Sequence, residues 1–327
     1  MTPAIDALPR FRLLGGPSPV HRLTRLEAEL GGHVELWMKR EDLLPLAFGG
    51  NKLRNLEFLV GAALAAGDDT LVTAGRRWSN HCRLTAAAGA RAGLAVHLVL
   101  SGPPAADAVG PGLDAMLGAT IHQLPTADRV ARDAVVAADI ERLRAAGRRP
   151  YLVPVGGSGL PGAVGQVLAG DELLDQLAAA PPDIVVLATA TGGTHAGVLA
   201  GLRARGSTAH VVGVLVAGPE AELRPVIEST LLDLAALTGV PVDPEDVLLD
   251  GSSGGAGYGR RDPEAEVAAS LLGRTEGILA DPIYTAKALA GLITGVRNGR
   301  WDGRRVVFWH AGGTPGLFEP LDDPGPA

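Results

Sequence analysis

The chain has 327 residues, of which 46% are hydrophobic, so it can bury the core of one large or two medium domains. Its formal net charge is -7 and its acidic and basic residues are mixed along the chain, which excludes the basic stripe that a nucleic-acid backbone needs. The N-terminus lacks a signal-peptide pattern, and no apolar run reaches membrane-spanning length without glycine, proline or charge. The single cysteine, Cys82, excludes an intrachain disulfide. We therefore expect a cytoplasmic protein with neither nucleic acid nor membrane as a partner.

Short β-rich runs alternate along the chain with longer segments of helical periodicity, which is typical of βα units around a mostly parallel sheet. The predicted strands are residues 69–74, 95–100, 120–124, 151–155, 183–190, 210–216 and 305–310. The predicted helices are residues 55–67, 133–147, 220–239 and 284–299. Glycine-rich joints at 49–52, 156–162 and 250–259 indicate a two-lobed α/β protein whose sites lie on loops at strand ends.

Lysine is rare in this chain, and each lysine is therefore a candidate for chemistry that arginine cannot perform. The 29 basic residues include only Lys39, Lys52 and Lys287 as lysine. Only an amine can lose its proton near neutral pH and form a Schiff base. Because a strong arginine bias usually reflects genome composition, rarity alone does not decide which lysine is functional.

Two glycine loops follow predicted strands, and they differ in what they can bind. The stretch "GSGLPG" has the spacing of a dinucleotide-binding loop, but Pro161 lies inside it and no acidic residue ends the next strand, so we reject that interpretation. The loop Thr191, Gly192, Gly193 and Thr194 runs from a strand into a helix, so backbone N–H groups and hydroxyls converge where the helix dipole favours an anion. The loop is either a phosphate site or an ordinary tight turn.

A third loop also gathers hydrogen-bond donors at a helix N-terminus. Ser79 stands at the N-cap position of a helix, with Asn80 and His81 in the first turn. A carboxylate would fit there, although Ser79 and Asn80 also suit a plain helix cap.

Taken together, these stretches resemble the D-cysteine desulfhydrase and 1-aminocyclopropane-1-carboxylate deaminase family. The resemblance lies in the order and spacing of "KREDLLPLAFGGNKLRNLEFL", "SNHCR", "PVGGSG", "ATATGGTHAG", "GGAGYG" and "DPIYTAKALAGLI", and it covers residues 13–318. It implies pyridoxal 5′-phosphate (PLP) as cofactor and PLP fold type II, with two open twisted, mostly parallel sheets flanked by helices as in the tryptophan synthase β-subunit. It also implies a large PLP-binding domain of residues 1–50 and 160–327, a small domain of residues 51–159, and a homodimer.

The resemblance also implies roles for individual residues. Lys52 matches the lysine that holds the cofactor as an internal aldimine, and Lys39 and Lys287 are then interpreted as surface or helix-end cations. Asn80 would lie beside the ring hydroxyl of the cofactor, and the loop from Thr191 to Thr194 matches its phosphate site. No metal is implied. The catalytic candidates are Lys52, Ser79, Tyr258 and Tyr284, and the substrate-binding candidates are Trp78, Ser79, Asn80 and His81.

Thr285 favours one branch of the family. The deaminase branch has a glutamate here, facing the pyridine nitrogen of the cofactor, whereas the desulfhydrase branch has threonine, as this chain does. A neutral hydroxyl cannot keep that nitrogen protonated as a carboxylate can, so the ring is a weaker electron sink. A weaker sink suits β-elimination of a good leaving group better than the opening of a cyclopropane ring.

Four departures from the family pattern predict an altered substrate pocket. Asn55 replaces a lysine that contacts the cofactor phosphate in the family. The negative charge of the phosphate is then neutralised less completely, or by another residue such as Arg54. Trp78 and Leu84 replace amides expected near the substrate, and Ala311 replaces a hydroxyl in the floor of the site. We expect Trp78 to lie close to the substrate side chain; the alternative is that it turns away and packs between the lobes.

The favoured function is a lyase that takes an amino acid with a β-leaving group, through C–S cleavage, to a 2-oxo acid and ammonia. The alternatives are β-substitution or racemisation on the same scaffold, 1-aminocyclopropane-1-carboxylate deamination, and a cofactor-poor binding protein derived from this fold. The pocket departures also leave open a specialised biosynthetic enzyme with a different amino-acid substrate.

Overall fold

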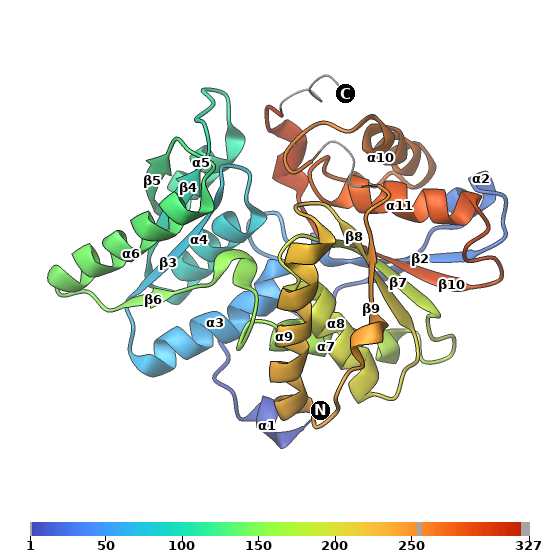
Figure 1. Cartoon of the computed structure of the whole chain (residues 1–327), viewed down its shortest axis with the longest axis horizontal. Helices are drawn as coiled ribbons and strands as arrows, with labels where there is room; N and C mark the ends of the chain where they lie inside the picture. Colours follow the sequence, from blue (N-terminus) through green and yellow to red (C-terminus); the bar gives the residue numbers. More distant parts are fainter. Residues whose placement is uncertain (1, 254–256, 322–327) are drawn as a thin grey trace.

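The computed structural model describes residues 2–253 and 257–321, which form two mostly parallel β-sheets flanked by helices (Figure 1). This α/β architecture is the one implied by the family resemblance. All seven predicted strands and all four predicted helices are confirmed, with ends that shift by a few residues. The strand predicted at 151–155 is the shortest of them, because it stops at Leu152 and a 3-10 turn follows at Val155–Gly157.

The smaller sheet has four parallel strands in the order β5-β4-β3-β6. Its strands are β3 (Thr70–Arg76), β4 (Ala95–Ser101), β5 (Thr120–Leu124) and β6 (Pro150–Leu152). The helices around it are α3 (Lys52–Ala66), α4 (Asn80–Ala92), α5 (Val109–Met116) and α6 (Arg129–Ala145). Apolar residues of α3 and α4 pack on one face of this sheet and those of α6 pack on the other.

The larger sheet has six strands in the order β1-β2-β10-β7-β8-β9, and only β1 is antiparallel to its neighbour. Its strands are β1 (Val20–Arg22), β2 (Glu35–Arg40), β7 (Ile184–Thr189), β8 (His210–Leu215), β9 (Val247–Asp250) and β10 (Arg305–His310). The main helices around it are α7 (Val164–Gln176), α8 (Gly193–Ala204), α9 (Glu220–Thr238), α10 (Pro263–Glu276) and α11 (Thr285–Arg297). The short helices are α1 (Pro3–Asp6), α2 (Thr24–Glu29) and the 3-10 turns Glu41–Leu43, Pro244–Asp246 and Thr314–Phe318.

The two faces of the larger sheet carry separate apolar cores. Helices α2, α10 and α11 bury their apolar residues against one face, and α7, α8 and α9 against the other (Figure 1). The central strands are buried on both faces, which explains their continuous apolar runs. Three strands were not predicted from sequence: β1 and β9 are short edge strands, and β2 carries charged residues whose partners lie far away in the chain.

The two sheets are formed by different parts of the chain. All four strands of the smaller sheet lie between residues 70 and 152, and the larger sheet joins β1 and β2 to strands that follow residue 183. The boundaries of the small domain, residues 51 and 159, stay a prediction. No helix in the described part of the chain is long and apolar enough to cross a membrane.

Candidate active site

A cavity of about 540 Å³ lies between the two sheets and is lined by residues of both. From the smaller sheet come the ends of β3 and β4 and the start of α4, and from the larger sheet the end of β7 and the start of α8. Carboxyl ends of parallel strands and N-termini of helices meet at such an edge, which is where ligands of α/β proteins bind. Of the predicted site residues, the wall contains Lys52, Ser79, Asn80, His81, Thr191, Gly192, Thr194, Tyr258 and Tyr284.

Lys52 is the first residue of α3, and its amine opens into this cavity. Burial lowers the pKa of Lys52 to about 8, because the protein withholds the water that would stabilise the charged form. Among the residues that the structure describes, no hydrogen-bond or ion-pair partner restores that charge. A lysine held in this way is partly neutral near physiological pH and therefore nucleophilic.

The loop before Lys52 has an unusual backbone that fixes where α3 begins. Leu46, Ala47 and Phe48 all have positive φ angles of 80°, 45° and 66°. Arg83 of α4 holds this loop by donating from Nε to the carbonyl of Ala47 at 3.0 Å. Backbone strain of this kind persists only where surrounding contacts impose it, and it is common at functional sites.

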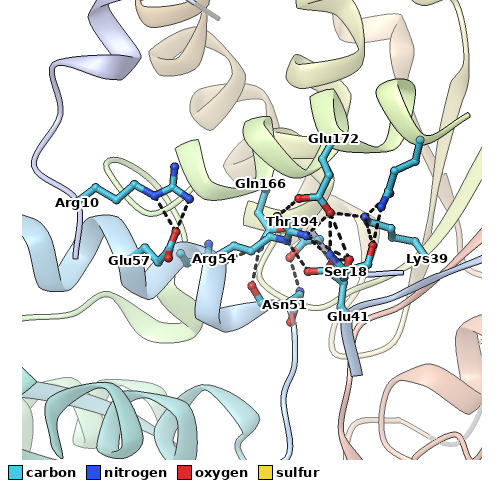
Figure 2. Close-up of polar contacts among 12 residues, drawn as sticks. Arg10, Ser18, Lys39, Glu41, Asn51, Arg54, Glu57, Gln166, Glu172 and Thr194 are labelled. Carbon is cyan, nitrogen blue, oxygen red and sulfur yellow. Dashed lines mark hydrogen bonds and ion pairs between the residues drawn. The ribbon is translucent and has the colours of Figure 1, made fainter. Parts of the chain in front are cut away.

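Asn51 connects the start of the Lys52 helix to the start of α8, as Figure 2 shows. Its Nδ2 donates to Thr194 Oγ1 at 2.7 Å, and Gln166 Nε2 donates to its carbonyl at 2.8 Å. The structure therefore brings Lys52 and the loop ending at Thr194 together, although 142 positions separate Lys52 from Thr194 in the sequence.

The loop from Thr191 to Thr194 forms a cradle rather than an ordinary turn. No side chain caps α8, so the backbone N–H groups of its first turn remain available. Ser158 Oγ donates to Thr191 Oγ1 at 2.6 Å, and a Cβ at Gly193 would lie 3.0 Å from the Cα of Ser158. Only glycine allows the two loops to meet this closely, and together they offer hydroxyls and N–H groups to an anion.

The start of α4 supplies a second group of donors. Ser79 caps the helix by accepting from Cys82 N at 3.2 Å, and it also lines the cavity with Asn80. Thr73 Oγ1 donates to the Val153 carbonyl, so His81 Nε2, at 2.9 Å, donates to Thr73. Burial, together with the nearby Lys52, lowers the pKa of His81 to about 3, so this histidine is neutral.

Two tyrosines from separate loops close the cavity. The hydroxyls of Tyr258 and Tyr284 are 2.5 Å apart and their rings are tilted at 56° with centroids 5.8 Å apart. Burial raises the pKa of Tyr284 well above 10, so its phenol remains protonated. Lys287 Nζ donates to the carbonyl of Gly257 at 2.6 Å, which anchors the loop beside Tyr258.

Lys39 and Lys287 are not surface cations, although Lys287 does lie in the first turn of α11. Both side chains are buried, and polar partners inside the protein stabilise their charges. Lys39 Nζ contacts Glu172 and donates to Gln176 Oε1 at 2.6 Å and to the Ser18 carbonyl at 2.8 Å. Neither lysine lines the cavity, which leaves Lys52 as the lysine of the wall.

Gly193 and Thr285 lie just outside the lining residues. Gly193 packs against Ser158, as described above. Thr285 begins α11 and its hydroxyl donates to the buried carboxylate of Asp281, which also accepts from the backbone N–H groups of Ile283 and Tyr284. The contact of Thr285 with a cofactor ring stays a prediction.

The four departures from the family pattern have different positions. Ala311 lines the cavity, and its carbonyl accepts from Asn51 N at 3.0 Å. Leu84 does not line the cavity: it is fully buried in the core of the smaller lobe, and a Cβ on Gly50 would contact it at 3.3 Å. Asn55 is also buried, where its Nδ2 donates to the Gly157 carbonyl at 3.0 Å and its Oδ1 accepts from Gln166.

Trp78 is a second layer behind the wall rather than part of it. Its ring meets that of Tyr258 edge to face at 5.8 Å, and the guanidinium of Arg77 stacks on it at 4.5 Å. A Cβ on Gly259 would lie 2.1 Å from the indole, so the tryptophan fills the space against the Tyr258 loop. The expected direct contact of Trp78 with a substrate is therefore not what this geometry offers.

Sequence reasoning did not identify several residues of the wall. Asn51, Ser158 and Arg76 all contribute polar atoms to the cavity or its rim. Asn51 and Ser158 lie inside quoted motifs, so their position next to Lys52 and Gly157 was the available signal. Arg54, considered as a source of phosphate charge, instead pairs with Glu41 and Glu172 away from the wall.

This combination of a two-sheet fold, a buried lysine and two helix N-termini defines a class of cofactor enzymes. A family model described as pyridoxal-phosphate dependent enzyme matches residues 11–312, and the chain belongs to this family. It is 39% identical over 321 residues to a D-cysteine desulfhydrase of Klebsiella pneumoniae (strain 342), covering 96% of this chain and 97% of that protein.

Solved structures agree with this assignment. The crystal structure of an ACC deaminase homologue superposes with a TM-score of 0.88 at 32% identity and covers 97% of both chains. A threonine deaminase isoform 2 from Solanum lycopersicum has a TM-score of 0.66 at 18% identity over 95% of this chain and 91% of its own, which supports the fold alone. The chain is thus a PLP-dependent enzyme of fold type II.

The residues present fit PLP. Lys52 offers a buried amine without a partner to the aldehyde, and the Ser158, Thr191 and Gly193 cradle offers hydroxyls and N–H groups to the phosphate. Both lie on one cavity and are connected through Asn51.

Proposed function

We propose that this enzyme is a lyase of the D-cysteine desulfhydrase type, which removes a β-leaving group from an amino acid and releases a 2-oxo acid and ammonia. The observation that carries the proposal is the buried Lys52, which has no partner in the described part of the chain and shares one cavity with two helix N-termini. The near full-length similarity to D-cysteine desulfhydrases supports cleavage of a C–S bond.

In this proposal Lys52, Asn80, Thr285 and the loop from Thr191 to Thr194 would hold PLP. When bound, PLP withdraws electrons from the α-carbon of an amino acid and so acidifies its proton. The neutral hydroxyl of Thr285 leaves the ring nitrogen without a carboxylate partner, which favours loss of a good β-leaving group over deeper electron withdrawal.

The remaining roles follow from what each side chain can donate or accept. Ser79, Asn80 and the backbone N–H of His81, in the first turn of α4, orient the substrate carboxylate. The protonated hydroxyl pair of Tyr258 and Tyr284 donates a proton to the departing group. Two lobes surround the reacting atoms and exclude water from them.

A second candidate is 1-aminocyclopropane-1-carboxylate deamination. The 32% identity to the ACC deaminase homologue favours it. Thr285 argues against it, because ring opening needs a stronger electron sink than a threonine hydroxyl supports. Homodimer formation and a cytoplasmic location remain proposals; light scattering and cell fractionation test them.

The test is a screen of D- and L-amino acids for 2-oxo acid release, with 1-aminocyclopropane-1-carboxylate included. Purified protein should be yellow, and borohydride should fix the cofactor on Lys52. Lys52→Ala should bind PLP only non-covalently and lose at least about a thousandfold in kcat. Lys39→Met, which removes a different buried amine, should keep the colour. A protein that stays colourless after PLP is added would refute the proposal.

A further inference from the structure

Arg76 is a cation of the cavity wall that has no anion beside it. It is the last residue of β3, three positions before the α4 cap, and it lines the cavity. Within residues 2–253 and 257–321, its guanidinium has no carboxylate partner and its buried Nε has no hydrogen-bond partner. A buried donor without a partner costs free energy, which an anionic ligand at Arg76 would offset.

The other arginines of the wall, Arg129 and Arg132, differ from Arg76 because they have carboxylate neighbours. Arg129 Nη1 lies 2.8 Å from Glu222 Oε2, and Arg132 Nη2 lies 2.7 Å from Asp133 Oδ1. Glu222 is the acidic side chain among the described lining residues, and it forms its ion pair with Arg129. The uncompensated charge at this side of the cavity is therefore that of Arg76.

Two neighbours hold the Arg76 side chain in place. Its guanidinium lies 5.4 Å from the centroid of the Trp78 ring, in cation–π contact. On the other side it approaches Gly102, where an added Cβ would lie only 3.2 Å from Nη1. Gly102 has a φ of 109°, so both its conformation and this close contact require glycine. The guanidinium thus has a built seat at the cavity rather than a free position in solvent.

The anions that the proposed function already requires have donors elsewhere. The cofactor phosphate has the cradle at the start of α8, and the substrate α-carboxylate has Ser79, Asn80 and His81 at the start of α4. Arg76 lies on the same side as Tyr258, since its guanidinium contacts the Trp78 ring and that ring meets the ring of Tyr258. Its position fits the part of the substrate that extends beyond the α-carbon, next to the tyrosines.

We propose that Arg76 binds an anionic group on the β-carbon of the substrate, so that the enzyme acts on amino acids with a sulfonate or phosphate leaving group. This inference rests on the proposed elimination. The bond from the β-carbon to the substituent breaks, and its electron pair leaves with sulfite or phosphate. The α-proton passes to the enzyme, and one water molecule completes the release of the 2-oxo acid and ammonia. A guanidinium is suited to this because it pairs with two oxyanion oxygens at once.

Kinetics of the holoenzyme distinguish sulfonate from phosphate and both from neutral groups. The substrates are D- and L-cysteate, D- and L-O-phosphoserine, and the neutral cysteine and β-chloroalanine. Arg76→Gln should lower the ratio of kcat/KM for the preferred anionic substrate to that for β-chloroalanine by about 30-fold, the effect of losing one charge-assisted contact. Arg76→Lys should lose part of this ratio.

Arg77 provides the matched control. It is the next residue and also contacts Trp78, but it does not line the cavity. Its Nη2 instead donates to the Pro320 carbonyl at 2.5 Å. Arg77→Gln should keep the ratio of anionic to neutral substrates within about threefold, since it removes a neighbouring cation that is paired with Glu319 and does not line the cavity.

A binding measurement separates this inference from the proposed function. Aspartate and asparagine have similar shapes and no β-leaving group, so calorimetric titration reports recognition without turnover. Tighter binding of aspartate that disappears in Arg76→Gln supports the inference even if no substrate is eliminated. Elimination from neutral substrates, with no preference for anions, overturns the inference and leaves the proposed function standing. An equal loss for all substrates would assign Arg76 to the α-carboxylate, and weaker PLP binding would assign it to the phosphate; either result overturns the inference.

Discussion

Helix α3 carries two buried basic groups, Arg54 and Lys52, of which one is paired with carboxylates and the other is not. Arg54 lies two residues after Lys52, and its guanidinium is bidentate to Glu41 at 2.6 and 2.8 Å and also contacts Glu172 (Figure 2). Lys39 reaches the same Glu172 from β2. Lys52 has no such partner in the described part of the chain. Paired charges fix the position of α3, whereas the unpaired amine is left reactive.

This difference has a physical consequence for stability and function. The network around Arg54 joins β2, α3 and α7, so the helix that carries Lys52 is held from two sides. A catalytic group must keep its position, and the free-energy cost of burying it unpaired must be offset by stabilising contacts around it. The comparison predicts that substitutions in the two groups change stability in opposite directions.

The largest effect is expected when the paired network is broken. Arg54→Met leaves Glu41 and Glu172 buried with fewer partners, and losing one member of a buried ion pair costs about 3–5 kcal/mol. Urea unfolding of the cofactor-free protein measures this change. Arg205, which pairs with Asp171 and Asp175 at the surface, is the control, and Arg205→Met should cost less than about 1 kcal/mol. Similar losses for both variants would contradict the structural role of the network.

The opposite sign is expected at Lys52. Its pKa is lowered from 10.5 to about 8, so the folded protein disfavours its charged form. Lys52→Met should therefore stabilise the cofactor-free protein at pH 7 by about 3 kcal/mol, the linkage value of that shift. The gain is full below pH 8 and disappears as the pH rises from 8 to 10.5, because the unfolded chain then loses its proton as well. A pH series of urea midpoints measures this trend, and Lys39→Met at pH 7 should be destabilising.

The sequence predicted the elements whose pattern is local and missed what depends on distant partners. The central strands were recognised by their continuous apolar runs, and the amphipathic helices by their helical periodicity. Strand β2 was missed because the partners that allow Lys39 to be buried are distant in the sequence, among them Glu172, which is 133 positions away. The adjacent Arg76 and Arg77 look alike in sequence, yet one faces the cavity and the other contacts Pro320.

The same reason explains the outcomes at the candidate site. Lys52 and the start of α8 follow from ordered motifs, and the structure places them together through Asn51 and Thr194. Leu84 and Trp78 were assigned to the substrate pocket because they stand where the family motif has amides, and Trp78 also because it directly precedes Ser79. Side chains on successive positions of a helix or turn point in different directions, so nearness in sequence did not place either of them in the wall.

Substitutions of the tyrosine pair test whether its hydroxyls donate a proton in the cavity that contains Lys52. Tyr258→Phe removes one of two hydroxyls that are 2.5 Å apart, so kcat should fall about tenfold, a typical contribution of one positioned donor, with KM little changed. Tyr284→Phe should have a similar effect, and the double variant should be no slower than either single one, because the hydroxyls act as one unit. Steady-state kinetics of all three variants provide the measurement. Effects that multiply in the double variant would show that the hydroxyls act separately.

The smallest change in specificity is expected at Trp78, even though tryptophan is the largest side chain near the site. Its ring packs on Tyr258 and Gly259 and between the arginines, and it is absent from the cavity wall. Trp78→Gln should therefore loosen the loop that carries Tyr258 and lower kcat to a similar extent for every substrate.

The measurement is the ratio of kcat/KM between D-cysteine and the best substrate of the screen, in the wild type and in Trp78→Gln. A structural tryptophan behind the wall should change this ratio by less than about threefold, whereas direct contact with the substrate side chain should change it by more than about tenfold. Arg76→Gln, measured in parallel, provides the opposite pattern, because its guanidinium faces the cavity and contacts Trp78 at the same time. If Trp78→Gln reproduces the specificity change of Arg76→Gln, then the indole determines specificity by holding the guanidinium in its seat.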